Sequence, residues 1–509
     1  MSSVLQRKTE PFQASHQNEM CRNISFALSL LMLMGALLFM AILIGRYPLP
    51  YIDESFFNYP AISFLQGHGF LGIVSSKAPY GTALWAFHGP FYPHLQVFVF
   101  WLIGISQEAS RLPNLIAGYL AACLMAYLLW REQYKFAPLI FALLWLGDRS
   151  TQEIQYARMD GLALLMVVIS FMMLNRFYKE PNCRNVFCAA FFGASALAFH
   201  PVTGLFLALG ASLIFFVSYK RKCLFGSFLS YVVGLAVVAF LVLVCVHFHP
   251  IEALQQFRWH MQYNCMSGTT LKAKLLNLLL VIRWSKWFFA ALACFTFFAA
   301  VPITLVKLSQ WRRKLIDGES FFALSMALFS VAGLVCLISK AVFPYYIIYF
   351  SIWPIALIAV SAERLLLRAR PVKLAAAAAI IIFLAWLPSA AWNAMRMREA
   401  FLYRNQLRHD SILAWLQKSI PANAKVSGDP LIYMLAEEAH LDFTPSPWIA
   451  EGSHAPGGAW LLLSEPEYTA PEYFSKADVH RRTVVFCSNA FPGAKDITFN
   501  VCLLRPLVN

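Results

Sequence analysis

The chain of 509 residues contains one apolar run after another of membrane-spanning length, and this feature limits what it can fold into. An apolar run of about 18 residues or more forms a transmembrane helix, because lipid offers backbone polar groups no hydrogen-bonding partner. Only 13% of the residues are charged and 59% are hydrophobic, whereas soluble globular proteins have about 25% charged residues. The sequence therefore predicts a polytopic α-helical membrane protein.

The apolar runs predict about eleven transmembrane helices. They cover residues 25–45, 109–130, 134–149, 161–177, 186–199, 201–218, 227–248, 284–306, 320–339, 342–361 and 373–391. The first run follows a mostly polar segment, residues 1–24, and has no small-residue cleavage site. We therefore interpret it as a retained helix rather than a signal peptide, with residues 1–24 in the cytoplasm.

Four short loops carry a marked excess of Lys and Arg, namely 176–184, 220–222, 307–314 and 364–373. Cytoplasmic loops have this bias. The net charge of +15 therefore indicates membrane orientation rather than nucleic-acid binding. The turns near 148–160, 200, 249–283 and 340 are then external. For a bacterial inner membrane, that side is the periplasm.

Residues 91–105 are apolar but short, and a further crossing there would turn every later basic loop outward. We interpret them as a helix that lies in the membrane interface, within one external loop over 46–110. A true span paired with a re-entrant segment elsewhere is the alternative. In this interpretation residues 25–391 form one membrane domain.

After Ala391 the composition changes to charged, Gly- and Pro-containing sequence with short alternating runs such as "AKVSGDP", "AWLLLS", "RTVVFCS" and "ITFNVCLLRP". These runs follow the helical pattern "HDSILAWLQKSI", so residues 392–509 are predicted to be a small extracytoplasmic α/β domain. The eleven cysteines include no CxxC pair, and no zinc or iron–sulfur site is expected.

Ionisable residues gather at the predicted external ends of at least five segments. They include Asp53, Glu54, Lys77, His88, His94, Arg111, Arg158, Asp160, His200, Arg258, His260, Arg283 and Lys340. Such groups are costly at membrane depth and therefore indicate function, although a single Arg or Lys is often only a snorkelling anchor. A carboxylate can accept a proton from a hydroxyl nucleophile, and cations can hold a leaving phosphate. This mixture suits glycosyl transfer from a polyprenyl-phosphate sugar.

Five stretches in this order resemble the GT-C glycosyltransferases, in particular the group of protein O-mannosyltransferases and bacterial aminoarabinose transferases of lipid A. They are "YIDESFF", "HGPFYPHLQVFVFWLIGISQEASRLPNLIAG", "QYARMDGLALLMVV", "GASALAFHPVTGLFLALG" and "KAVFPYYIIYFSIWPIALI". The resemblance covers about residues 25–365 and leaves 392–509 without a match. It implies a GT-C-like fold, a polyprenyl-phosphate sugar as donor, and a glycan, lipid or protein hydroxyl as acceptor.

The resemblance also implies roles for particular residues. Asp53 would be the catalytic base, and the leaving phosphate would lie near Arg158 and Lys340, with Arg111 as a helper. His200 stands where the family usually has a lysine, and we assign it to the same phosphate. Glu54 is expected to orient Asp53 or the acceptor. Further candidates for substrate binding are Asp160, His88, Arg258, His260, Tyr345 and Tyr346.

Several alternatives stay open. Asp53 could instead be the N-cap of a helix over "ESFFNYPAISFL". No cofactor is certain; a divalent metal ion on Asp53 and Glu54 is conceivable, but two adjacent carboxylates without a third partner make a weak site. The chain could also be a transporter or flippase of lipid-linked sugars, or a non-catalytic assembly subunit of a machine that builds envelope glycans. A transporter would favour inverted repeats, which the sequence does not show.

Overall fold

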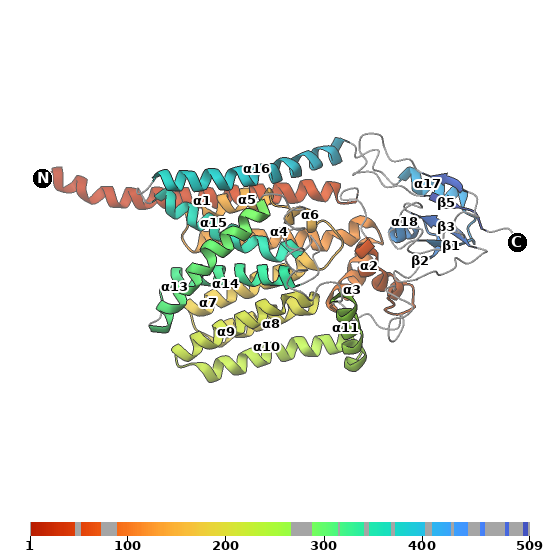
Figure 1. Cartoon of the computed structure of the whole chain (residues 1–509), viewed down its shortest axis with the longest axis horizontal. Helices are drawn as coiled ribbons and strands as arrows, with labels where there is room; N and C mark the ends of the chain where they lie inside the picture. Colours follow the sequence, from red (N-terminus) through yellow and green to blue (C-terminus); the bar gives the residue numbers. More distant parts are fainter. Residues whose placement is uncertain are drawn as a thin grey trace.

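The protein is a long bundle of roughly parallel helices with a small domain at one end (Figure 1). The computed structural model describes residues 2–45, 52–72, 89–265, 288–313, 316–339, 346–367, 372–402, 410–428, 432–445, 459–463, 484–487 and 502–506. Within these ranges, nine helices are long and apolar enough to cross a membrane. Three shorter apolar helices, α3, α5 and α8, accompany them.

Each of the eleven predicted spans overlaps a described helix, and the predicted fold class is confirmed. The helices at two of them, α5 and α8, are shorter than the nine that could cross a membrane. The helices of the bundle are α1 (Ser2–Leu43), α4 (Gln107–Arg131), α5 (Ala137–Leu146), α7 (Asp160–Lys179), α8 (Cys183–Phe199), α9 (Gly204–Lys220), α10 (Leu224–Cys245), α13 (Val301–Arg313), α14 (Gly318–Ser339), α15 (Ile347–Leu367) and α16 (Val372–Leu402). A π-helical turn, Thr296–Ala300, precedes α13. Shorter helices α2 (Ile52–Leu65), α3 (Phe91–Ile103), α6 (Ser150–Glu153) and α11 (Pro250–Cys265) lie at the end nearest the small domain (Figure 1).

Helices α4 and α7 approach closely because small residues face each other. A Cβ atom on Gly161 of α7 would lie 2.4 Å from the carbonyl oxygen of Asn114 and 3.1 Å from the backbone nitrogen of Gly118, both on α4. Asn114 locks the contact, since its Nδ2 donates to the Tyr156 carbonyl (2.9 Å) and its Oδ1 accepts from Gly161 N (2.5 Å). This packing fixes the loop before α7.

Helix α5 has only ten residues, or about 15 Å, and the chain then continues through α6 to α7. Its two ends are held by other helices. The buried carboxylate of Glu363 on α15 accepts backbone N–H bonds from Lys135, Phe136 and Ala137 at 2.7–2.9 Å. At the opposite end, Trp386 Nε1 and Asn393 Nδ2 of α16 donate to the carbonyls of Leu144 (3.2 Å) and Asp148 (3.0 Å). Segment 147–159 is thus enclosed by protein.

The C-terminal domain begins after α16, which continues beyond the predicted boundary at Ala391 to Leu402. It contains α17 (Asp410–Ser419), α18 (Tyr433–Glu438) and a five-stranded mixed sheet in the order β2-β1-β3-β5-β4. The strands are β1 (Lys425–Gly428), β2 (Asp442–Pro445), β3 (Trp460–Leu463), β4 (Val484–Cys487) and β5 (Cys502–Leu504). β1 pairs in parallel with β2 and β3, while β5 is antiparallel to β3 and β4. The predicted small α/β domain is therefore present.

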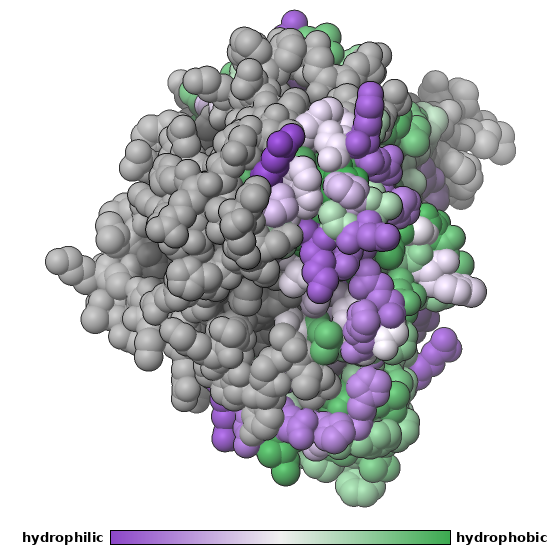
Figure 2. Space-filling model, turned by 90° about the vertical axis from the view of Figure 1, so that its right-hand side faces the viewer, coloured by the Kyte–Doolittle hydropathy of each residue, from purple (hydrophilic) through white to green (hydrophobic). Residues whose placement is uncertain are grey.

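The end of the molecule that carries this domain differs from the sides of the bundle. Figure 2 shows hydrophilic residues gathered over the described part of this face, with hydrophobic residues mainly towards its edge. Many side chains of the bundle are instead large, hydrophobic and exposed, such as Leu31, Phe225 and Phe298. This contrast is what a membrane around the helices and water at the end face require.

Candidate active site

Helix α2 carries the adjacent carboxylates at the domain end of the bundle. It begins at Ile52, so Asp53 lies inside the first turn and is not the N-cap. Successive helix positions point about 100° apart, and the two side chains consequently have different environments. The Glu54 side chain is 2% exposed and that of Asp53 is 17% exposed.

Glu54 makes a buried ion pair with Arg111, near the start of α4. Arg111 Nε and Nη2 donate to the two carboxylate oxygens at 2.7 and 2.8 Å. Ala157 N (2.6 Å) and Gln107 Nε2 (3.1 Å) also donate to Glu54, and Arg111 Nη1 donates to the Ile44 carbonyl at the end of α1 (2.8 Å). The pair therefore ties α1, α2, α4 and the loop before α7 together.

Asp53 contacts the second arginine of the site. Arg158 Nη1 donates to Asp53 Oδ2, and Arg158 Nε donates to Asp160 Oδ2 at 2.7 Å. Asp160 Oδ1 accepts from the Tyr349 hydroxyl of α15 (2.9 Å), and the guanidinium of Arg158 lies 5.1 Å from the ring centre of Phe57. Arg158 is 1% exposed and Asp53 is 17% exposed. Asp53 therefore lies where the buried network of Arg158, Asp160 and Tyr349 reaches the surface.

His200 and Tyr346 lie beside this network. His200 is buried at the turn between α8 and α9, and its Nδ1 accepts from Val202 N at 3.2 Å. Its ring centre is 5.4 Å from that of Tyr346 and 5.7 Å from that of Tyr349. Arg258 is exposed on α11. Lys340, His88 and Tyr345 lie outside the described residues, as does the side chain of His260.

The structure thus brings together five predicted residues, Asp53, Glu54, Arg111, Arg158 and Asp160. Their pairing differs from the expectation in one respect: Glu54 bonds Arg111 rather than Asp53. Sequence analysis missed Gln107 and Tyr349, which bond the carboxylates of the site, and Asn114, which holds the backbone of the loop before α7. Tyr349 could have been found, because it follows Tyr345 and Tyr346 at helical spacing.

The loop before α7 carries one more buried carboxylate, Glu153, which bonds Arg149 at 3.2 Å. Burial raises the pKa of Glu153, while the nearby Arg149 opposes the shift. Among the described residues, no group of three or more His, Cys, Asp or Glu side chains could hold a metal ion. The carboxylates of the described site can accept a proton, and its arginines can stabilise negative charge.

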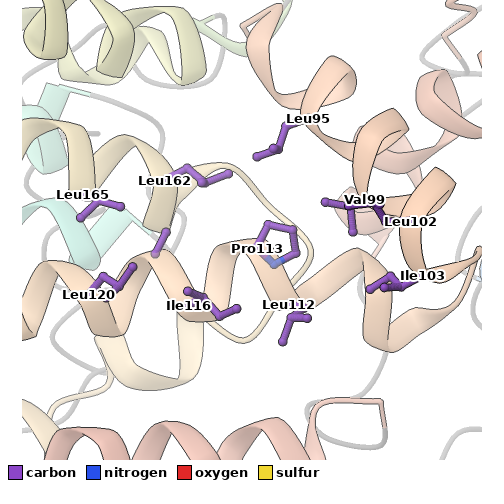
Figure 3. Close-up of a pocket in the computed structure, with 11 residues that line it drawn as sticks. Leu95, Val99, Leu102, Ile103, Leu112, Pro113, Ile116, Leu120, Leu162 and Leu165 are labelled. Atoms are coloured by element: carbon purple, nitrogen blue, oxygen red, sulfur yellow. The ribbon is translucent and has the colours of Figure 1, made fainter.

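An apolar groove of about 400 Å³ opens between α3, α4 and α7 (Figure 3). All its lining residues are apolar: Leu95, Val99, Leu102, Ile103, Leu112, Pro113, Ile116, Ala117, Leu120, Leu162 and Leu165. Ala117 and Leu162 also belong to the hydrophobic cluster that contains Phe57. The groove is therefore continuous, through apolar packing, with the ring on which Arg158 rests.

The fold is that of the GT-C membrane glycosyltransferases. The structure is similar to that of ArnT from Cupriavidus metallidurans bound to undecaprenyl phosphate, with a TM-score of 0.52 and 15% identity over 93% of this chain and 97% of that chain. The apo form of the same protein gives a TM-score of 0.53 at 16% identity, with the same coverage.

An oligosaccharyltransferase from Archaeoglobus fulgidus, tethered to an acceptor peptide with the NVT sequon, is also similar. The TM-score is 0.52 at 14% identity, over 93% of this chain and 74% of that chain. No family model matches the sequence, and no curated protein matches it either. The likeness at this level of identity establishes the shared fold.

Proposed function

We propose that the protein is an integral-membrane glycosyltransferase that moves a sugar from a polyprenyl-phosphate donor to a hydroxyl of a glycan, lipid or protein acceptor. The observation that carries the proposal is the direct contact of Asp53 with Arg158 at the hydrophilic end of the bundle. One group is a proton acceptor and the other can bind phosphate. The GT-C fold supports the same reaction class, and the similar ArnT structure is bound to undecaprenyl phosphate.

In this mechanism the acceptor oxygen forms a bond to the anomeric carbon of the sugar, and the bond from that carbon to the phosphate oxygen breaks. The proton of the acceptor hydroxyl passes to Asp53. The polyprenyl phosphate leaves with the bonding electrons, and Arg158 stabilises its charge. The phosphate would compete with Asp53 for Arg158 Nη1, so donor binding would release Asp53 for the base role, while Asp160 continues to hold Arg158 Nε.

The apolar groove would hold the isoprenoid tail nearest the phosphate. Its walls are wholly apolar, and it is linked to Arg158 through Phe57. An isoprenoid offers only hydrocarbon surface, which is stabilised in such a groove by the hydrophobic effect. Glu54 and Arg111 satisfy each other in a buried pair, so we assign them to holding the geometry of α2 rather than to contact with the phosphate.

The proposed reaction takes place on the extracytoplasmic side, in a bacterium the periplasmic face of the inner membrane. The basic loops support this orientation, since they lie at the opposite ends of the helices from Asp53. A topology reporter inserted near Gln107 should be external, and one at Arg312 cytoplasmic. A cytoplasmic reporter near Gln107 would overturn both the orientation and the interfacial placement of α3.

The activity is tested with cells that express either the wild-type protein or Asp53→Asn at equal levels. Mass spectrometry of their glycans, glycolipids and glycoproteins should show one sugar modification that depends on Asp53. The purified protein should then release undecaprenyl phosphate from the corresponding lipid-linked sugar. A modification that persists in Asp53→Asn cells, or identical profiles with and without the gene, would contradict the proposal.

A further inference from the structure

Helix α18 of the C-terminal domain packs on the two membrane-domain helices that carry the acidic pair and its arginine. The ring of Tyr433 lies 5.1 Å from that of Tyr59 on α2, in an edge-to-face arrangement. A shared hydrophobic cluster unites α2, α3 and α4 with the domain, through Ala61, Ile62, Phe100, Ala109, Leu416, Ile420, Val426, Tyr433, Leu435 and Leu462. The domain is therefore docked by a common core rather than attached by a linker alone.

Two adjacent glutamates of α18 reach different helices. Glu437 Oε2 accepts from Gln66 Nε2, just beyond the end of α2, at 3.1 Å. Glu438 Oε1 accepts from the backbone N–H of Gln107, the first residue of α4, at 2.8 Å. An N–H in the first turn has no partner within its own helix, and a carboxylate there also interacts favourably with the helix dipole.

Gln107 connects Glu438 to the candidate active site. Its side chain is buried, and its Nε2 donates to Glu54 Oε2 at 3.1 Å. Glu54 in turn holds Arg111 in the bidentate pair. A continuous series of bonds therefore runs from Glu438 of the C-terminal domain, through Gln107, to the residue beside Asp53.

We propose that α18 is a positioning element for the acidic pair, with Glu438 acting through Gln107 on Glu54. Glu438 touches none of the reacting groups, so it is a positioning residue and not a catalytic one. The domain would hold α2 at three points: at the first turn through Gln107 and Glu54, in the middle through Tyr433 on Tyr59, and just beyond its last turn through Glu437 on Gln66. This inference deepens the proposed glycosyltransferase function and, for its kinetic consequence, rests on it.

Three variants of the full-length protein in nanodiscs test the proposal. Glu438→Ala removes the acceptor of the Gln107 N–H bond. Glu438→Gln keeps an oxygen acceptor but removes the charge. Asp442→Ala is the control, because Asp442 is an exposed acidic residue of the same domain, on β2.

The first measurement is hydrogen–deuterium exchange of α2, which needs no substrate. Loss of a hydrogen bond to a charged group should make the amides of residues 54–59 exchange about tenfold faster in Glu438→Ala. Glu438→Gln should bring exchange back to within about threefold of wild type, since a neutral hydrogen bond is roughly half as strong. Asp442→Ala should match the wild type.

The second measurement separates binding from turnover. Binding of undecaprenyl phosphate should stay within about twofold of wild type in all three variants, because Glu438 does not contact the proposed phosphate site. With the donor used by the wild type, kcat should fall about tenfold in Glu438→Ala, with KM for the donor unchanged, and Glu438→Gln should restore it to within about threefold.

Unchanged exchange of α2 in Glu438→Ala would overturn the proposal, and so would equal defects in Glu438→Ala and Asp442→Ala. A fall in kcat that Glu438→Gln does not relieve would also contradict it. If the wild type transfers no sugar from any polyprenyl-phosphate donor, the proposed function fails. The exchange measurement would still decide whether α18 positions α2.

Discussion

Two neighbouring substitutions on α2 should separate catalysis from stability. Asp53→Asn should abolish transfer and leave the fold intact, whereas Glu54→Gln should destabilise the protein. Each change replaces a carboxylate by the amide of the same shape, so the local environments alone account for the difference. Glu54 is enclosed by four donor atoms, while Asp53 is partly exposed at the mouth of the site.

The loss of stability expected for Glu54→Gln follows from the burial of its ion-pair partner, Arg111. The guanidinium of Arg111 is 0% exposed, and the substitution leaves it without its counter-charge. The new NH₂ group must also face an N–H donor. Removing one member of a buried ion pair costs about 3–5 kcal/mol, a large part of a typical free energy of unfolding. We expect the unfolding temperature to fall by about 5 °C or more.

Asp53→Asn should lower the stability of the protein only slightly but should lower its turnover rate strongly. Arg158 keeps its 2.7 Å bond to Asp160, so no buried charge is left unpaired. A partly exposed pair contributes about 1 kcal/mol or less, and the unfolding temperature should move by less than about 2 °C. Removal of a general base should lower turnover by about 10² to 10⁴.

Thermal unfolding of detergent-purified protein, followed by size-exclusion chromatography, gives the stability of each variant. Release of undecaprenyl phosphate, per mole of folded protein, gives the rate. Glu319→Gln is the matched control, because Glu319 is 58% exposed and pairs with Arg364 at the opposite end of the bundle. A Glu54→Gln protein as stable as wild type, or an Asp53→Asn protein that unfolds equally early, would refute the reasoning.

Arg158→Ala should weaken binding of undecaprenyl phosphate about 10- to 100-fold, since a charge-assisted hydrogen bond contributes about 1.5–3 kcal/mol. Arg131→Ala, at the other end of α4, should bind normally, and equal defects in both would indicate misfolding instead. Cys487 and Cys502 are directly opposite in the β4–β5 register, and we expect them to form a disulfide in an oxidising compartment. Both should then resist thiol labelling of denatured, unreduced protein, and full labelling of the two cysteines would exclude this disulfide. Burial raises the pKa of Glu437, and hydrogen bonds from Tyr433 and Gln66 oppose the shift. The folded protein therefore binds this proton more tightly than the unfolded chain, and stability should fall as pH rises from about 4.5 through the raised pKa. Glu437→Gln should remove that dependence in a pH series of unfolding temperatures.

The helical bundle was predictable because membrane helices must satisfy their backbone internally and turn apolar side chains outward. Composition and run length alone carry that information. The helix ends were less predictable. α5 stops at Leu146, although the apolar run suggests a helix to 149, and α16 continues to Leu402 through charged residues. These ends depend on contacts such as Asn393 with Asp148, which the local sequence does not reveal.

The residue types of the site were predictable, but not their partners. Paired carboxylates and arginines at helix ends are visible in one sequence. That Glu54 would bond Arg111, 57 positions away, is set by the packing of α2 on α4. Gln107 and Asn114 are uncharged and act only through geometry, so composition gave no reason to select them.

The enclosure of segment 147–159 by α16 has a consequence for how the chain is made. The donors on Trp386 and Asn393 follow their acceptors on Leu144 and Asp148 by 242 and 245 residues. At a synthesis rate of about 5–20 residues per second, that separation corresponds to roughly 12–50 seconds. Throughout this interval the carbonyls at the end of α5 need water or a membrane insertase as a temporary partner, because lipid supplies none. The loop that carries Arg158 is thus among the last parts of the membrane domain to be completed, although it is translated in the first third of the chain.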